Sequence, residues 1–140
     1  LDAFAGSGAL GLEALSRGAK HVTFIENSPQ TAQTIKANIA NLHSESSCTL
    51  IIGDATKPPK THQSMQLVFL DPPYNQQCED ICIMALESQG WIDAETLIIL
   101  ETSQKRDLKL PPSTQLIDQR RYGATLISFC RVIRDDRGDQ

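Results

Sequence analysis

The sequence lacks any long apolar segment, because no hydrophobic run approaches the ~20 residues that a membrane-spanning helix needs. It also lacks a basic-then-apolar leader. These two absences predict a protein without a membrane partner. A length of 140 residues suits one domain with a core of its own, which we expect over residues 1–134, followed by a polar tail over residues 135–140.

Cysteines are few, and their spacing excludes the common thiol and metal motifs. Cys78 and Cys82 stand four positions apart, so neither a C-x-x-C redox motif nor a repeated zinc-binding pair is present. Cys48 and Cys130 fall inside apolar strand patterns and are predicted to be small core residues. We therefore expect reduced thiols, a cytoplasmic location and no metal site.

Positive charge is scarce over most of the chain. The net charge is −4, and residues 1–102 carry only five Lys/Arg against twelve Asp/Glu. Residues 103–140 reverse this balance, with eight Lys/Arg against five Asp/Glu. This basic end is consistent both with a surface that faces a phosphate backbone and with an ordinary solvated tail.

Strand and helix patterns alternate along the chain. The expected strands are residues 1–4, 21–25, 48–52, 65–70 and 96–100, and the expected helices are residues 9–17, a segment from Pro29 to about Leu42, and residues 79–88. This order predicts an α/β fold, with a three-layer, doubly wound and mostly parallel sheet. Two last strands at 115–121 and 124–133, joined by a tight turn at Tyr122-Gly123, add an antiparallel pair. Because Leu1 reads as the interior of a strand, we expect an upstream segment to be missing.

Apolar residues at helical spacing predict the buried faces of two helices. After Ser28-Pro29, an N-cap and a proline at the first helical position, the inward residues are expected to be Ala32, Ile35, Ile39 and Leu42. In the helix at 79–88 they are expected to be Ile81, Met84 and Ala85.

Unusual residues follow four of the expected strands. They are the glycine-rich turn at 5–8, the carboxylate Glu26, the pair Gly53-Asp54, and the proline-rich segment at 71–74. In doubly wound sheets, ligands bind at the carboxyl ends of the strands, near the point where the strand order reverses. The sequence therefore predicts a binding site along this edge.

The glycine-rich turn has the spacing of a cofactor loop. Residues 6–11 match G-x-G-x-x-G after a strand and before a helix, where glycine lets the backbone approach a ligand. Glu26 follows Gly6 by twenty residues and can accept hydrogen bonds from both hydroxyls of a ribose. Asp54 and Ala55 could contact an adenine edge. This pattern predicts a nucleoside-containing cofactor and leaves NAD and S-adenosylmethionine open.

The segment Asp71-Pro72-Pro73-Tyr74 predicts a site for a planar ring that bears an amino group. The Asp71 carboxylate and the Pro72 carbonyl can accept both amino hydrogens, while the prolines hold these acceptors rigid before the reaction. Tyr74 would stack on the base. A base inside a folded nucleic acid would have to be extruded to reach the loop.

Three other functions compete with a reaction at such an amino group. A nicotinamide-dependent dehydrogenase would explain the glycines and Glu26 but leaves residues 71–74 without a role, and His21, His43 and His62 look like surface residues. A cofactor- or RNA-binding domain without catalysis would have no need of Asp71. A cytosine C5 enzyme requires a cysteine nucleophile, and the proline loop contains none.

The tetrapeptide Asp71–Tyr74 resembles the signature of S-adenosylmethionine-dependent methyltransferases that act on amino nitrogens. The stretch LDAFAGSGALGLEALSRGA at 1–19 is similar to the cofactor motif of the RsmD family, which methylates N2 of a guanine in bacterial small-subunit ribosomal RNA. The likeness continues through VFLDPPY, GWIDAETLIILE and the closing strands. DNA and RNA adenine-N6 methyltransferases share the tetrapeptide and remain an alternative.

The resemblance implies a residue set for the site. The methionine part of S-adenosylmethionine would be lined by Asp2, Phe4, Ala5, Gly6, Ser7 and Gly8. The ribose and adenine would meet Glu26, Asn27, Asp54 and Ala55, and the target base would meet Asp71, Pro72, Pro73 and Tyr74. The partner would be ribosomal RNA or an assembling small-subunit particle, and the enzyme would be a monomer. Two departures are the absence of the family's basic upstream segment and the sequence Lys57-Pro58-Pro59-Lys60, which disfavours the usual short helix.

Overall fold

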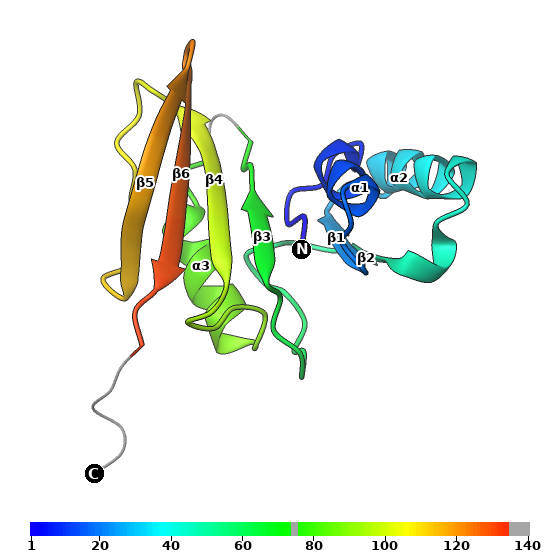
Figure 1. Cartoon of the computed structure of the whole chain (residues 1–140), viewed down its shortest axis with the longest axis horizontal. Coiled ribbons are helices and arrows are strands. Elements are labelled where there is room, and N and C mark those ends of the chain that lie inside the picture. Colours follow the sequence, from blue (N-terminus) through cyan, green and yellow to red (C-terminus); the bar gives the residue numbers. More distant parts are fainter. Residues whose placement is uncertain (74–75, 135–140) are drawn as a thin grey trace.

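The computed structural model describes residues 1–73 and 76–134, so Tyr74 and the expected tail lie outside the described residues (Figure 1). The elements in chain order are α1 (Ala9–Ser16), β1 (Val22–Glu26), α2 (Pro29–Asn41), η1 (Glu45–Ser47), β2 (Cys48–Ile52), β3 (Leu67–Leu70), α3 (Glu79–Ser88), β4 (Leu97–Ser103), β5 (Thr114–Tyr122) and β6 (Thr125–Val132). Among the described residues, no helix is both long and apolar enough to span a bilayer.

The strands form one sheet, which the first residues of the chain join together. β1 pairs in parallel with β2, β3 pairs in parallel with β4, and β6 lies antiparallel between β4 and β5. Asp2 bridges Phe24 of β1 and Phe69 of β3, and its N–H donates to the Thr23 carbonyl at 2.9 Å. The spatial order is therefore β2, β1, the segment at 1–5, β3, β4, β6 and β5. The order reverses on either side of that segment, which is the switch point of a doubly wound sheet.

The two faces of the sheet carry separate apolar clusters. Phe24 packs with Ile35 and Ile39 of α2, whereas the next residue, Ile25, belongs to the cluster that contains Ile83 of α3. Because neighbouring residues of a strand point to opposite faces, α2 and α3 cover opposite sides of the sheet. The predicted α/β fold with helices on both faces of the sheet is confirmed.

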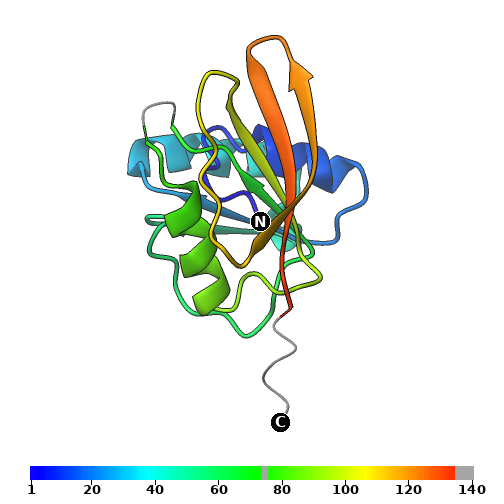
Figure 2. The same cartoon turned by 90° about the vertical axis from the view of Figure 1, so that its left-hand side faces the viewer.

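The antiparallel pair at the C-terminal end is also confirmed. β5 and β6 run antiparallel, and Gly123 adopts the positive φ of +59° in the turn between them. The tip of this hairpin projects beyond the helices (Figure 2). Every residue of β5 after Thr114 is exposed, as expected for an edge strand.

Helix α2 begins as its sequence indicates. The Ser28 hydroxyl accepts a hydrogen bond from the Thr31 N–H at 3.2 Å, and Pro29 occupies the first helical turn. Ala32, Ile35 and Ile39 are buried as predicted. The prediction for Leu42 is wrong, because α2 ends at Asn41 and Leu42 is 58% exposed at the C-cap.

The predicted inward face of α3 is wrong for Ile81 and Met84, whereas Ala85 is partly buried and the bounds of the helix are correct. Ile81 and Met84 are more than half exposed, while Cys82, Ile83 and Leu86 face the core. The buried face also includes Glu79, which forms an ion pair with Arg106. Apolar residues occur on both faces of this helix, so their spacing alone could not identify the buried one.

The thiols and the loop before β3 follow the sequence predictions. All four cysteines are free; Cys130 is buried in the core and Cys48 is partly buried at the start of β2. The described residues between Gly53 and Gln66 contain no helix, as residues 57–60 indicate.

Candidate functional site

A hydrogen bond joins the glycine turn to the end of β1. The Glu26 carboxylate accepts hydrogen bonds from the Gly6 N–H at 2.7 Å and from the Ser28 N–H at 3.1 Å. Gly6 has a φ of +56°, and a Cβ at this position would meet no atom within 4 Å, so one side of the turn is open. An ionised carboxylate has about four acceptor sites, and the two remaining sites of Glu26 can receive two further donors.

The close approach of α1 to β1 holds this turn in place. Gly11 lies in the first turn of α1, and a Cβ there would stand 2.8 Å from Cγ1 of Val22 and collide with the Phe24 ring. The N–H of Gly11 donates to the carboxylate of Asp2 at 3.1 Å. Asp2 is 2% exposed, and burial raises the pKa of its carboxyl. Asp2 therefore anchors the amino end of α1 from beneath the turn.

A pocket of about 300 Å³ opens beside this turn. Its lining includes five of the residues predicted for the cofactor: Phe4, Gly6, Glu26, Asn27 and Ala55. The predicted residues Asp2, Ala5, Ser7, Gly8 and Asp54 do not belong to the lining. The lining also contains Gly53, which belongs to the predicted binding edge, and Ala3 and Ile25, which were not predicted as site residues although each lies in an expected strand.

The Asp54 carboxylate accepts hydrogen bonds from within its own loop. Its Oδ1 accepts from the backbone N–H and the hydroxyl of Thr56, at 2.8 and 2.7 Å. These bonds lower the pKa of the Asp54 carboxyl. The predicted contact of Asp54 with an adenine edge stays a prediction.

Asp71 and Pro72 stand between this pocket and a second one of about 420 Å³, because both residues line both pockets. Pro73 lines only the first, and the predicted Tyr74 lies outside the described residues. Partial burial and, after it, the negative charges of Glu101 and Asp2 together raise the pKa of the Asp71 carboxyl to about 6. Asp71 therefore gains and loses its proton closer to neutral pH than an ordinary aspartate does.

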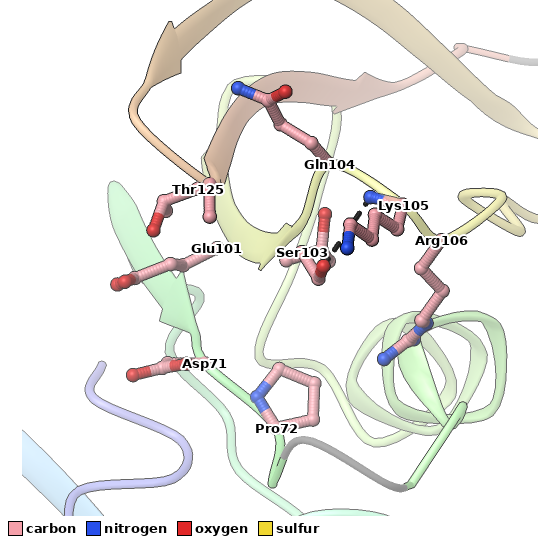
Figure 3. Close-up of a pocket in the computed structure, with 10 residues that line it drawn as sticks. Asp71, Pro72, Glu101, Ser103, Gln104, Lys105, Arg106 and Thr125 are labelled. Atoms are coloured by element: carbon pink, nitrogen blue, oxygen red, sulfur yellow. Dashed lines mark hydrogen bonds between the residues drawn. The ribbon is translucent and has the colours of Figure 1, made fainter.

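The second pocket is built mainly from the end of β4 and the loop after it (Figure 3). Apart from Asp71 and Pro72, none of the residues that line this pocket was predicted as a site residue. They are Glu101, Thr102, Ser103, Gln104, Lys105 and Arg106 from β4 and its loop, and Ala124 and Thr125 where β6 begins. The loop is held against α3 by the ion pair between Arg106 and the buried Glu79. Glu101 follows the strand expected at residues 96–100, but the sequence does not indicate that this strand lies beside the one that precedes Asp71.

The comparisons with known proteins agree with this architecture. A family model described as "Conserved hypothetical protein 95" matches residues 1–131. The Ribosomal RNA small subunit methyltransferase D of Haemophilus influenzae is 36% identical over 127 residues, which are 88% of this chain and 66% of that protein. A putative rRNA methyltransferase of Bacillus subtilis is 32% identical over 92% of this chain and 73% of its own length. The chain spans 57% of the corresponding Escherichia coli methyltransferase D, at 35% identity.

Solved structures give the same result for the fold. A putative methylase from Haemophilus influenzae has a TM-score of 0.82 and 33% identity, covering 95% of this chain and 85% of that one. A putative methyltransferase from Escherichia coli also has a TM-score of 0.82, with 29% identity over 96% of this chain and 76% of that one. The family model covers nearly the whole chain, and the resemblance of residues 1–19 and 71–74 to the RsmD family agrees with the names of these relatives. The chain therefore belongs to the Conserved hypothetical protein 95 family, the family of the RsmD ribosomal RNA methyltransferases.

Proposed function

We propose that the protein transfers a methyl group from S-adenosylmethionine to the exocyclic N2 amino group of a guanine in small-subunit ribosomal RNA. The observation that carries this proposal is the shared wall between the two pockets. Asp71 and Pro72 border both the pocket beside the glycine turn and the pocket at the end of β4. Two reactants held in these pockets would meet at the residues best placed to accept amino hydrogens.

The first pocket fits a nucleoside-containing methyl donor. Its volume of about 300 Å³ lies at the lower end of the ~300–1,000 Å³ range of small-molecule sites. Glu26 presents acceptor sites for the ribose hydroxyls at one edge, and Gly6 leaves open space on the side where another residue would carry a Cβ. When bound, S-adenosylmethionine would supply an electrophilic methyl group on a positively charged sulfur.

The proline loop would orient the nucleophile. The Asp71 carboxylate and the Pro72 carbonyl would accept the two amino hydrogens, which aims the nitrogen lone pair across the shared wall. Bound S-adenosylmethionine would supply the methyl group and keep the electron pair of its C–S bond on sulfur, and the amino nitrogen would supply the pair for the new N–C bond. The amino nitrogen then gives up one proton, to Asp71 or to water beside it. With its pKa near 6, Asp71 is largely ionised at neutral pH and can accept that proton.

The substrate class comes from the relatives together with the motif. Proteins named ribosomal RNA small subunit methyltransferase D match most of this chain, and the tetrapeptide at 71–74 is typical of amino-nitrogen methylation. Ribosomal RNA as substrate implies a cytoplasmic enzyme that acts on free RNA or on an assembling particle.

The test is methyl transfer from labelled S-adenosylmethionine by the full-length protein to small-subunit RNA, small-subunit particles and duplex DNA. We expect labelled N2-methylguanine in the ribosomal RNA, identified by mass spectrometry of its nucleosides. Asp71→Ala should reduce transfer by at least about 100-fold, the lower range for a positioned acid–base group, with cofactor affinity retained. Glu87→Gln, an exposed change on α3, is the control. Labelled N6-methyladenine in DNA without any label in RNA would refute the proposal.

A further inference from the structure

Glu101 is the second carboxylate of the pocket at the end of β4, and the proposed transfer gives it no role. The parallel register pairs Leu70 of β3 with Leu100 of β4, so Asp71 and Glu101 occupy the next positions along two adjacent strands. Both residues line the same pocket. In Figure 3 their side chains extend in the same direction, one above the other.

The negative charges of Asp71 and Glu101 repel each other. Glu101 contributes to the raised pKa of Asp71, as expected for like charges at short range. Within the described residues, the Glu101 side chain forms neither an ion pair nor a hydrogen bond, although the residue is partly buried. Two cations line the same pocket: Arg106 is already paired with Glu79, and the Lys105 side chain lies apart from Glu101 and Asp71 (Figure 3). Two neighbouring acceptors without donors fit a ligand that presents several donors along one edge.

Guanine presents such an edge, and adenine does not. The amino group at C2 of guanine carries two hydrogens, and the adjacent ring nitrogen N1 carries a third. In adenine the ring nitrogen beside the amino group is an acceptor, which a carboxylate would repel. A site whose acceptors lose their contact with water when a ligand binds rejects a ligand that lacks the matching donor, because the acceptors are then left unpaired.

Resting on the proposed function, we infer that Glu101 selects guanine by accepting the N1–H of the target base while Asp71 and Pro72 hold its amino group. Glu101 is thus a specificity-determining residue. It sits one strand farther from the cofactor pocket than Asp71, and it does not line that pocket. Its removal should therefore change which base reacts and leave cofactor binding intact.

The test compares guanine with 2,6-diaminopurine at the target position. This analogue keeps the 2-amino group that is methylated but has an acceptor at N1. The modified position is first mapped by mass spectrometry, and small-subunit RNA with either base there is then prepared by ligation. Rates of methyl transfer (kcat/KM) are measured for the wild-type full-length protein, Glu101→Gln and the control Glu87→Gln, together with cofactor affinity.

The wild type and the control should prefer guanine over 2,6-diaminopurine by at least about fivefold, the lower end of the range for a good base contact. Glu101→Gln should bring this ratio close to one, because an amide can accept from N1–H or donate to an unprotonated N1. Cofactor affinity should stay within about twofold of the wild type.

Two results would overturn the inference and separate it from the proposed function. If the wild type methylates both bases equally well, or if Glu101→Gln keeps the full preference for guanine, Glu101 does not read N1–H even though the enzyme is a guanine methyltransferase. If the wild type transfers no methyl group to guanine in any ribosomal RNA, the proposed function fails, and the inference fails with it.

Discussion

The two pockets that meet at Asp71 are built in different ways. The pocket beside the glycine turn is lined largely by small or apolar residues at strand ends, such as Ala3, Gly53 and Ala55, and by the anchored carboxylate Glu26. The pocket at the end of β4 is lined mainly by polar and charged side chains of one strand end and its loop. The first has the features of a preformed site for one common ligand, and the second those of a site that specifies a substrate.

The largest expected effect comes from breaking the ion pair that holds the second pocket. Arg106→Met would leave Glu79, which is 1% exposed, without its cationic partner, and such a loss costs about 3–5 kcal/mol of unfolding free energy. The matched control is Arg134→Met, which removes an exposed pair with Glu95 and should cost less than about 1 kcal/mol. Chemical denaturation measures both changes. Equal losses in the two variants would show that the buried pair does not stabilise the loop.

A second variant tests the packing beneath the first pocket. Gly11→Ala places a methyl group against Val22 and Phe24, and overpacking of this kind costs about 1–3 kcal/mol. Gly53→Ala is the control, because a Cβ there meets only Ile51, at 4.0 Å, and the unfolding free energy should change by less than about 0.5 kcal/mol. Denaturation curves of both proteins would contradict this prediction if Gly11→Ala were the more stable.

Glu26 offers a change that should affect one pocket alone. Glu26→Ala removes a charged acceptor, which is worth about 1.5–3 kcal/mol, so the affinity for S-adenosylmethionine should fall by roughly 10- to 100-fold. Binding of RNA should be unchanged, because Glu26 does not line the second pocket. Glu13→Ala, on the exposed face of α1, is the control. Calorimetry with cofactor and a filter assay with RNA would separate the two affinities; a matching loss in both would mean that the pockets are not independent.

The smallest expected effects concern pH. The pKa of Asp71 is raised to about 6, so the folded protein holds this proton more tightly than the unfolded chain. The contribution of Asp71 to stability is therefore full below about pH 4 and is lost as the pH rises through 6. The rate of methyl transfer should rise over the same interval, as Asp71 becomes able to accept a proton. Asp71→Asn should remove this dependence of stability on pH; a dependence that persists would assign it to another group.

The first pocket could be predicted from the sequence to a larger extent than the pocket at the end of β4. Gly6 and Glu26 belong to a motif defined by local sequence spacing, so the sequence alone could assign them to one site. Both line the first pocket, and their contact with a cofactor stays a prediction. The alternation of strands and helices likewise gave the fold class. Glu101 was missed because its importance depends on β4 lying beside β3, which is a tertiary relation.

The error in the predicted buried face of α3 also arises from a contact between residues far apart in the sequence. A glutamate at the start of a helix normally indicates a solvated position, and Ile81 and Met84 are apolar enough to suggest the core. The burial of Glu79 depends on Arg106, which lies 27 positions along the chain. Periodicity within one helix contains no information about such a partner. The role of Asp2 also depends on a tertiary contact. Its carboxylate accepts from the Gly11 N–H and so anchors α1, whereas its neighbours Ala3 and Phe4 line the pocket.

The wall formed by Asp71 and Pro72 has a consequence for inhibitor design. Because these two residues border both cavities, a single compound that joins an adenosine to a purine through a short linker could occupy both cavities at once. Occupying the second cavity would add selectivity over the many enzymes that share only the adenosine site. The affinity of such a compound, relative to its two halves, would report how far apart the two cavities hold their ligands.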